Sequence, residues 1–339
     1  MAAPASISDF QTALSLMNHI YLNPVIGALV RHGVPDHLDK GPLPAAELAK
    51  IAGMNALSLT RALRALAAMG AFREVSPGMF ANSPISDLFR NRPGGLRNLA
   101  LYYSSEDVQK SAAALGHSVV TGHSAITHVL GQTFWEHMRQ HPEKNETFNR
   151  ALAELRGNEH QQVADAYDWA GVNTVVDVGG GVGSLLVAIL ESRRGIRGFL
   201  IEQAELIADA DRMLSDRGVR DRCELLAQSF FDPISTAGDV WMLSQVLHDW
   251  PDAECLRILR RCRDAMRSKD RLLVIEMLTV PCEPNIHVGL IDMMMLMYFG
   301  EARQRTVEEY KNLFDSTGFS LARVLPTAGA FSIVEALPA

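Results

Sequence analysis

The stretch VVDVGGGVG, residues 175–183, decides the fold of the second half of this chain. A short run of β-branched residues contains an acid, a glycine-rich turn follows, and residues 184–192 then have helical length and composition. Gly179, Gly181 and Gly183 allow positive φ and remove the Cβ atoms that would block a ligand. The pattern therefore predicts a strand, a turn and a helix that bind a nucleoside cofactor at the carboxyl edge of a parallel sheet.

A second acid, Glu202, fits the same kind of ligand. It ends the next apolar run, residues 198–201, which has the length of a buried strand. A carboxylate in this position can accept hydrogen bonds from both hydroxyls of a ribose.

Two cofactors fit a glycine turn of this kind. The dinucleotide pattern G-x-G-x-x-G would fall on Gly179, Gly181 and Ser184, so its third glycine is absent. Asp177 would repel a pyrophosphate, but it can organise the glycine turn and the cationic amino-acid end of S-adenosylmethionine. We therefore expect S-adenosylmethionine, with S-adenosylhomocysteine as its product. A dinucleotide site and a glycine turn without a ligand are the alternatives.

The composition sets the class of protein. The chain has 339 residues, 47% hydrophobic and 21% charged, which is ordinary for a soluble globular enzyme with two domains. A net charge of -7 argues against nucleic-acid binding and against an anionic membrane surface. No window of 18 residues is apolar throughout, and residues 1–4 lack the features of a signal peptide. Four cysteines without Cys-x-x-Cys spacing predict neither a metal site nor disulfides, so we expect a cytoplasmic protein.

Three segments are expected along the chain. Residues 1–100 predict helices over 15–31, 45–51 and 58–69 and a hairpin of 72–75 with 79–81, which together outline a winged helix. This segment has nine Lys/Arg against six Asp/Glu, and its helix 58–69 is mostly apolar, so we expect it to dimerise rather than to enter a DNA groove. Residues 101–170 predict a helical, substrate-lining linker with turns at Gly116 and Gly122.

Residues 171–339 predict an α/β catalytic domain. Strands are expected at 175–178, 199–201, 223–226, 240–244 and 271–276, with helices between them. A hairpin of 319–325 with 330–335 would add an antiparallel edge. This alternation is typical of a mostly parallel sheet that is covered on both faces.

Two further residues are placed at the same edge of the sheet. His248 follows the strand 240–244, and histidine titrates near neutral pH, so it could remove a proton from a phenolic hydroxyl. Glu276 ends the next strand and could hold the imidazole in one tautomer. The alternatives are a capping or packing role for His248 and a cap or surface position for Glu276.

These motifs resemble those of class I S-adenosylmethionine-dependent O-methyltransferases. This family includes plant caffeate and flavonoid enzymes and bacterial antibiotic-tailoring enzymes that act on phenazine and polyketide scaffolds. Residues 177–183 and the triplet His248-Asp249-Trp250 carry the most specific likeness, and segments 46–49, 63–66 and 148–151 extend it over nearly the whole chain. The resemblance implies a Rossmann-like seven-stranded catalytic domain, an N-terminal winged-helix-like dimerisation domain and a homodimer.

The resemblance also implies roles for individual residues. His248 would be the general base, flanked by Glu276, with Gln304 as the third residue of the catalytic set. Residues expected to bind the cofactor are Asp177, Gly179, Gly181, Glu202, Ser229, Phe230, Ser244 and Trp250. A planar, mainly apolar aromatic acceptor would contact Phe134, Trp135, Phe148, Asn149, Asp292, Met293, Met297 and Tyr298.

Three positions depart from the family pattern. Ser229 stands where many members have Asp beside the adenine, and Ser244 stands where many have Lys or Arg. Gln304 replaces the usual Glu, and an amide cannot neutralise an imidazolium. These departures leave open methylation of carbon or nitrogen on the same fold. An alternative of another class is a non-catalytic winged-helix regulator that senses a ligand.

Overall fold

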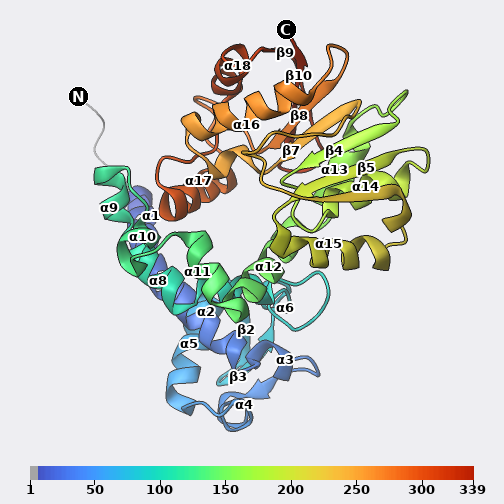
Figure 1. Ribbon diagram of the computed structural model, residues 1–339. Helices are drawn as coiled ribbons and strands as arrows, with labels where there is room; N and C mark the ends of the chain where they lie inside the picture. Colours follow the sequence, from blue (N-terminus) through green and yellow to red (C-terminus); the bar gives the residue numbers. More distant parts are fainter. Residues whose placement is uncertain (1–6) are drawn as a thin grey trace. The chain divides into compact units, whose positions relative to one another are not determined.

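The computed structural model describes residues 7–339, so the expectation about residues 1–4 lies outside the described part. Contacts divide the chain into two units (Figure 1). The first unit extends to Ala113 and includes Trp135–Gly157, and the second comprises Ala114–Phe134 and Asn158–Ala339. The expected middle segment, residues 101–170, contributes to both units.

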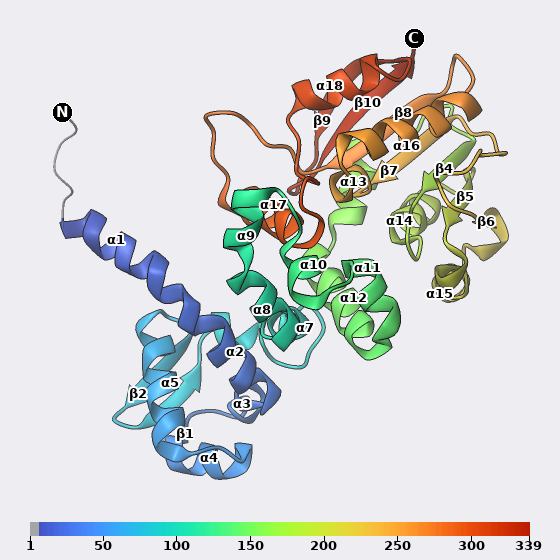
Figure 2. The ribbon, with the colours of Figure 1, turned by 60° about the vertical axis from the view of Figure 1, so that its left-hand side comes forward.

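The first unit begins with helices that follow one another as a nearly continuous rod (Figure 2). The helix expected over 15–31 is divided by a 3-10 turn at His19–Tyr21. Pro24 lies in the first turn of α2, where its missing N–H breaks no helical hydrogen bond. The elements of this part are α1 (Ile7–Asn18), η1 (His19–Tyr21), α2 (Leu22–Arg31), α3 (Val34–His37), α4 (Ala45–Ala52), α5 (Ala56–Ala68) and α6 (Pro84–Asp87).

The hairpin predicted in this unit is confirmed. β2 (Phe72–Ser76) pairs antiparallel with β3 (Met79–Asn82), and the short β1 (Leu43–Pro44) pairs with the other side of β3. Leu48 of α4 and Leu63 of α5 are buried against Phe80 of β3, which gives this unit its own hydrophobic core. The other helices of the unit are α7 (Arg97–Tyr103), α8 (Glu106–Ala113), α12 (Pro142–Arg156) and, from Trp135 onward, α11 (Phe134–Gln140).

The segment between residues 113 and 170 is helical, as expected. Gly122 ends α9 (Leu115–Thr121) in a left-handed conformation with φ 74°. The turn expected at Gly116 is wrong, because Gly116 lies inside α9. The other helices here are α10 (Ala125–Leu130), α11 (Phe134–Gln140) and α13 (Glu159–Ala166).

The second unit is built on the predicted seven-stranded sheet, in the order β6-β5-β4-β7-β8-β10-β9 (Figure 1). Neighbouring strands are parallel from β6 to β8, and β10 is antiparallel to both of its neighbours. The strands are β4 (Thr174–Val178), β5 (Arg197–Glu202), β6 (Cys223–Ala227), β7 (Val240–Ser244), β8 (Arg271–Glu276), β9 (Phe319–Pro326) and β10 (Ser332–Pro338).

Helices cover both faces of this sheet. Trp241 of β7 is buried with Ile258 of α16 (Asp252–Ala265) and Phe314 of α18 (Val307–Asp315) in one hydrophobic cluster. On the opposite face, Leu186 of α14 (Ser184–Ser192) lies 2.9 Å from the position that a Cβ on Gly198 would occupy, so glycine there lets helix and strand approach closely. The remaining helices are α15 (Ala204–Asp216) and α17 (Ile286–Phe299).

One stretch in the described residues, Ile7–Arg31, is long and apolar enough to cross a membrane by length and composition alone. Its best window has a mean hydropathy of 1.3 and is 17% buried. A single helix near the N-terminus is weak evidence for a span, because signal sequences and the helices of soluble proteins pass the same test.

The parallel strands place the predicted site residues along one edge. β4, β5, β7 and β8 run in the same direction and end at Val178, Glu202, Ser244 and Glu276. The segments that follow these ends therefore meet at the carboxyl edge of the sheet, where open α/β folds bind ligands.

Candidate active site

The glycine turn after β4 has the conformation that its sequence predicts. Gly179, Gly181 and Gly183 have φ of 70°, 59° and 81°, a region that strains other residues. The backbone N–H of Gly179 donates to Ile201 O at 2.8 Å, and that of Gly183 donates to Gly180 O at 2.9 Å. Gly183 then caps α14, so the turn is fixed to the neighbouring strand and to the helix that follows.

A fourth glycine in this turn is required for a different reason. A Cβ on Gly180 would lie 2.3 Å from Asp177 Oδ2 and 2.5 Å from a methyl carbon of Leu200, so no larger residue fits there. The spacing of the glycines does not reveal the role of Gly180, because this constraint is a tertiary contact. On the other side of the turn, a Cβ on Gly179 would lie 3.2 Å from the Phe230 ring, which places that ring against the turn.

Asp177 is a buried acid without a partner. Its side chain is fully buried, and neither carboxylate oxygen has a hydrogen-bond partner among the described residues. Burial, together with the nearby Glu202, raises its pKa to about 7. An unpaired carboxylate under a glycine turn fits a ligand that brings a positive charge, such as the ammonium group of S-adenosylmethionine, and does not fit a pyrophosphate.

Glu202 has partners on both carboxylate oxygens. Its Oε2 accepts from Gly181 N at 2.9 Å, and its Oε1 accepts from Gln203 N at 2.7 Å. Burial raises the pKa of this carboxyl, and the two N–H groups oppose that shift. Glu202 therefore links the end of β5 to the glycine turn, and its remaining lone pairs can accept from hydroxyl groups.

Aromatic rings gather beside the turn. Phe230 and Phe231 each contact Trp250 edge-on, with ring centroids 6.0 and 4.9 Å apart. The Ser229 hydroxyl accepts from Phe231 N at 3.2 Å, which fixes the start of this segment. Ser244, the last residue of β7, is half-buried at the same edge. Ser229 and Phe230, which are expected beside the adenine, and Ser244 and Trp250, which are expected elsewhere along the cofactor, therefore lie in the same unit as Asp177 and Glu202.

His248 lies between two carboxylates. It belongs to the short helix η3 (Leu247–Asp249) that follows β7. Its Nδ1 donates to Glu276 Oε2 at 2.5 Å, its main-chain N donates to Glu276 Oε1 at 3.3 Å, and its Nε2 lies 3.2 Å from Asp249 Oδ1. Glu276 is fully buried at the end of β8, so it holds the imidazole in a fixed orientation.

The charge state of His248 follows from these neighbours. Burial lowers the pKa of the imidazole, but the Glu276 and Asp249 carboxylates outweigh burial and raise it to about 10. The ring is therefore protonated at neutral pH in the ligand-free protein, and both of its nitrogens donate. Before Nε2 can accept a proton, it must release its own.

Arg305 closes the turn that carries His248. Its guanidinium is fully buried and donates to Leu247 O and to Trp250 O, each at 2.7 Å. The same group donates to Asp252 Oδ1 at 2.8 and 3.0 Å, which satisfies it in the interior. Arg305 was not among the predicted site residues, although it lies directly beside Gln304.

Gln304 and Asp292 are joined through the backbone. The main-chain N of Gln304 donates to Asp292 Oδ1 at 2.7 Å, which ties this segment to α17. Gln304 is 4% exposed. Both residues lie in the same unit as His248. Arg305, which follows Gln304, hydrogen-bonds to Leu247 O and Trp250 O on either side of the histidine.

The residues predicted to contact an acceptor divide between the two units. Phe134 stacks on Tyr298 in the second unit, with ring centroids 4.6 Å apart, and Asp292, Met293 and Met297 belong to that unit too. In the first unit, Trp135 meets Phe148 edge-on at 6.4 Å, and Asn149 follows Phe148 in α12. These residues therefore form two separate groups, each described within its own unit.

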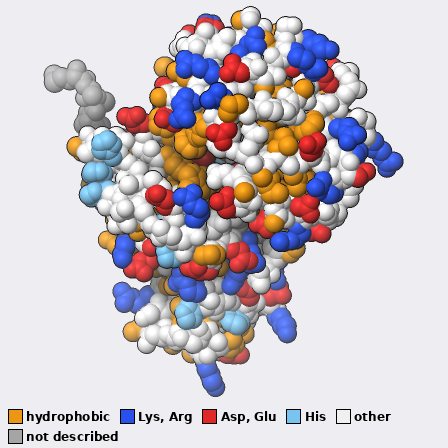
Figure 3. All heavy atoms as spheres, viewed as in Figure 1, with side chains coloured by type: hydrophobic (Ala, Val, Ile, Leu, Met, Phe, Trp, Pro, Cys, Tyr) orange, Lys and Arg blue, Asp and Glu red, His pale blue; other side chains and the backbone are white. Residues whose placement is uncertain are grey.

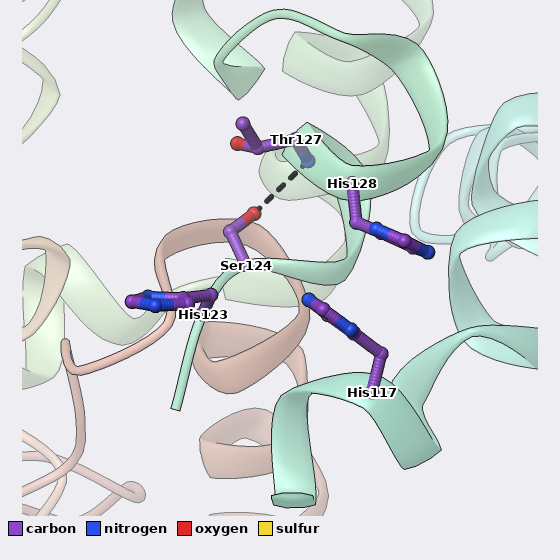
Figure 4. Close-up of a pocket in the computed structure, with 5 residues that line it drawn as sticks. All are labelled: His117, His123, Ser124, Thr127 and His128. Carbon is purple, nitrogen blue, oxygen red and sulfur yellow. Dashed lines mark hydrogen bonds between the residues drawn. The ribbon is translucent and has the colours of Figure 1, made fainter. Parts of the chain in front are cut away.

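A pocket of about 370 Å³ in the second unit is lined by none of the predicted residues, although the hydroxyl of its Ser124 donates to Met297 O and Tyr298 O (Figure 4). It is lined by His117, His123, Ser124, Thr127 and His128. The rings of His117 and His128 stack with centroids 4.0 Å apart, and His123 is not part of that stack. No group of three His, Cys, Asp or Glu in residues 7–339 is arranged to hold a metal ion.

The surface carries charges of both signs. On the face that Figure 3 draws, basic and acidic side chains are interspersed and form no continuous basic field. A nucleic-acid site needs a clustered positive surface, so this face does not favour one.

Comparison with known proteins gives two family matches. Residues 113–320 match the model of an O-methyltransferase domain, and residues 14–92 match that of an O-methyltransferase dimerisation domain. A phenazine O-methyltransferase of Lysobacter antibioticus is 39% identical over 307 residues, which cover 90% of this chain and 89% of the relative.

Solved structures agree with these matches. The structure of a mitomycin 7-O-methyltransferase superposes on this chain with a TM-score of 0.91 and is 34% identical to it in sequence. The superposition covers 98% of each of the two chains. An O-methyltransferase of neocarzinostatin biosynthesis, solved with S-adenosylmethionine and 2-hydroxy-5-methyl naphthoic acid, has a TM-score of 0.81 and 31% identity and covers 94% of this chain and 96% of its own.

The first prediction concerns the unpaired carboxylate. Asp177 has a pKa near its ordinary value of 3.8 in the unfolded chain and a pKa of about 7 in the folded protein. Between these values the folded protein holds a proton that the unfolded chain has lost, so the free energy of unfolding falls as pH rises. Asp177→Asn should therefore gain stability relative to the native protein between pH 5 and pH 8, as measured by thermal unfolding.

Asp177→Asn should also weaken the binding of S-adenosylmethionine by at least about tenfold in calorimetric titration, because one charge-assisted contact is worth roughly 1.5–3 kcal/mol. Asp216→Asn, an exposed change in α15, is the matched control and should alter neither property. Unchanged affinity in Asp177→Asn would contradict the assigned role.

The second prediction concerns the turn around His248. Lysine carries all its donors on one nitrogen and lacks the planar fork by which Arg305 reaches two carbonyls and a carboxylate, so Arg305→Lys should lower the free energy of unfolding by on the order of 2 kcal/mol. The loosened turn should also weaken the contact between His248 and Glu276 and move the imidazole pKa down from about 10. Denaturant unfolding and NMR titration of the histidines would measure these changes.

Arg303→Lys is the matched control for this change. Arg303 contacts the same Asp252, but its other partners are Glu309 and Glu301 O, not the carbonyls beside His248. The control should leave the His248 titration unchanged. If both variants shifted it equally, Arg305 would have no special role.

Proposed function

This chain belongs to the O-methyltransferase family, and we propose that it methylates a hydroxyl group of a small, planar aromatic acceptor. It is an S-adenosylmethionine-dependent methyltransferase. The observation that carries the proposal is the hydrogen bond between His248 and Glu276. It lies at the carboxyl edge of the sheet, the edge at which the glycine turn follows β4.

Different residues at this edge would bind different parts of the cofactor. S-adenosylmethionine, when bound, supplies a methyl group already activated by its sulfonium. Asp177 would hold the cationic amino-acid part, Glu202 the ribose hydroxyls, and Phe230 with Ser229 the adenine. Binding would give Asp177 the opposite charge that it lacks in the free protein, which favours its ionised form.

His248 would take the proton of the acceptor hydroxyl. Glu276 occupies Nδ1, so Nε2 is the nitrogen left to act as the base. Nε2 faces Asp249 in the free protein, and the acceptor hydroxyl would have to replace that carboxylate. Glu276 stabilises the imidazolium that forms. General-base catalysis of this kind contributes roughly 10²–10⁴-fold to a rate, and alignment of the reactants supplies much of the remainder.

The acceptor class rests on the apolar groups and on the relatives. The aromatic and methionine side chains of Phe134, Trp135, Phe148, Met293 and Met297 offer flat apolar surfaces that suit a planar ring. Two similar proteins are named for phenazine and mitomycin, and a third was solved with a naphthoic acid; all three of these compounds contain fused rings. We place this protein in the same kind of secondary metabolism.

We infer that the enzyme is a homodimer. α1 has no buried residue, and large apolar side chains such as Ile7 and Phe10 are 81% and 64% exposed on it. An exposed apolar helix of this kind in a chain with a dimerisation domain is most simply covered by a second copy.

The four cysteines of the chain are unpaired, which suits the reducing environment of the cytoplasm.

Nitrogen methylation is the second candidate activity. Gln304 provides no negative charge where the family usually has Glu, so less charge is available to stabilise an imidazolium. An amine acceptor needs less help from a base than a phenol, because its lone pair attacks without prior loss of a proton. Mass and NMR analysis of product labelled from a deuterated donor would identify the methylated atom.

The test of the proposed base is His248→Ala. The variant should bind S-adenosylhomocysteine with native affinity and lose about 10²–10⁴-fold in turnover of a phenolic acceptor. Calorimetric titration and a product assay measure the two effects separately. His128→Ala removes a histidine that is not among the predicted site residues, so it is the control and should keep native turnover. Native turnover in His248→Ala would show that His248 is not the general base.

The pH dependence tests the role of Asp249. Because His248 must lose a proton whose pKa is about 10 in the free enzyme, kcat/KM should rise with pH through the alkaline range. Asp249→Asn removes a charge that raises this pKa, so the rise should move to lower pH. A profile in the same place for both proteins would show that Asp249 does not control the imidazole.

A further inference from the structure

The histidine pocket of the second unit has no part in the proposed function. It has a volume of about 370 Å³ and is lined by His117, His123, Ser124, Thr127 and His128 (Figure 4). Sites for small molecules in proteins have volumes of roughly 300–1,000 Å³, so this pocket is large enough for a small ligand. All five lining side chains are polar, and three of them can carry a positive charge.

Two of the imidazoles are stacked. The rings of His117, in α9, and His128, in α10, lie with centroids 4.0 Å apart and an interplanar angle of 12°. The nitrogen lone pairs of two parallel rings do not converge, so this pair is not arranged to chelate a metal ion. One charged ring can lie against a neutral one, but a second proton would bring two like charges face to face. An anion beside the stack would offset that repulsion.

No carboxylate in residues 7–339 forms an ion pair with these rings, because the ion pairs of histidine all lie elsewhere. α17 packs against both α9 and α10, and its titratable residues are His287, Asp292 and Tyr298. Asp292 accepts from Gln304 N, and Glu301, which follows α17, has no ion pair with the pocket. The three histidines therefore lack a negative partner in the described part of the chain.

The pocket is fixed to the end of α17. The Ser124 hydroxyl donates to Met297 O at 3.1 Å and to Tyr298 O at 2.8 Å. A Cβ on Gly300 would lie 2.7 Å from Gly122 O, so glycine there lets the chain after α17 meet the backbone of the loop between α9 and α10. A wall that is already held in place loses little conformational entropy when a ligand binds.

We propose that this pocket binds a small organic anion with carboxylate or phosphate groups. Protonated rings of His117 and His128 donate to its oxygens, and the Thr127 hydroxyl is a further donor on the wall. Histidine gains its charge below neutral pH, so the anion binds more tightly as pH falls. The inference does not depend on the proposed function, because this binding needs neither the cofactor nor the acceptor.

Calorimetric titration of the full chain with succinate tests the proposal. Succinate should bind at least about tenfold more tightly at about pH 6 than at about pH 8, because the protonated fraction of an ordinary histidine falls by more than that over the interval. Glycerol 3-phosphate should behave in the same way. Binding of inorganic phosphate with no binding of either organic anion would contradict an organic ligand.

Variants place the anion in the pocket. His117→Gln removes a ring that can be charged and should weaken succinate binding at about pH 6 by at least about tenfold. His128→Arg keeps its charge in alkaline solution, so this variant should bind succinate more tightly than the native protein at about pH 8. His287→Gln, an exposed change in α17 outside the pocket, is the matched control and should keep native affinity.

Three results would overturn the inference. These are equal succinate affinity at both pH values, native affinity in His117→Gln, and an equal loss in His287→Gln, which would show a response to net charge rather than to the pocket. No binding of succinate or of glycerol 3-phosphate would overturn it as well. Native affinity of His117→Gln for S-adenosylhomocysteine checks that this variant is folded, and His128→Arg tests the proposal independently if it is not.

Discussion

The burial of charged groups at the carboxyl edge of the parallel sheet is the constraint on which the rest of the site depends. β4 carries Asp177, a carboxylate that has no hydrogen-bond partner in the described part of the chain, and Gly180 leaves space for it. A buried carboxylate without a partner lowers stability, so its presence at this edge points to a functional role. The glycine turn lies over that carboxylate, Glu202 accepts a hydrogen bond from the turn, and Phe230 packs against the turn at Gly179.

The same principle explains the second half of the site. His248 is buried with two carboxylates, and its turn is held by the buried guanidinium of Arg305, which is satisfied by two carbonyls and Asp252. The imidazole cannot rotate freely, so its Nε2 keeps one direction. The Glu276 and Asp249 carboxylates together raise the pKa of the imidazole to about 10, so the ring is protonated in the free protein.

The sequence predicted elements well wherever local pattern decides the structure. The helix 184–192 and the strands 240–244 and 271–276 have the expected bounds, because apolar runs closed by glycine or an acid define them. Gly116 was misread as a turn, since a lone glycine is tolerated inside a helix. The roles of Gly180 and Arg305 could not be predicted, because they depend on contacts with residues that only the tertiary fold brings near.

A crystal structure of the protein with S-adenosylhomocysteine and a phenolic acceptor tests the central claim most directly. The account predicts the amino-acid end of the nucleoside at Asp177, its ribose at Glu202, and the acceptor hydroxyl within hydrogen-bond distance of His248 Nε2. A nucleoside that leaves the carboxylate of Asp177 unpaired, or an acceptor out of reach of the imidazole, would contradict it.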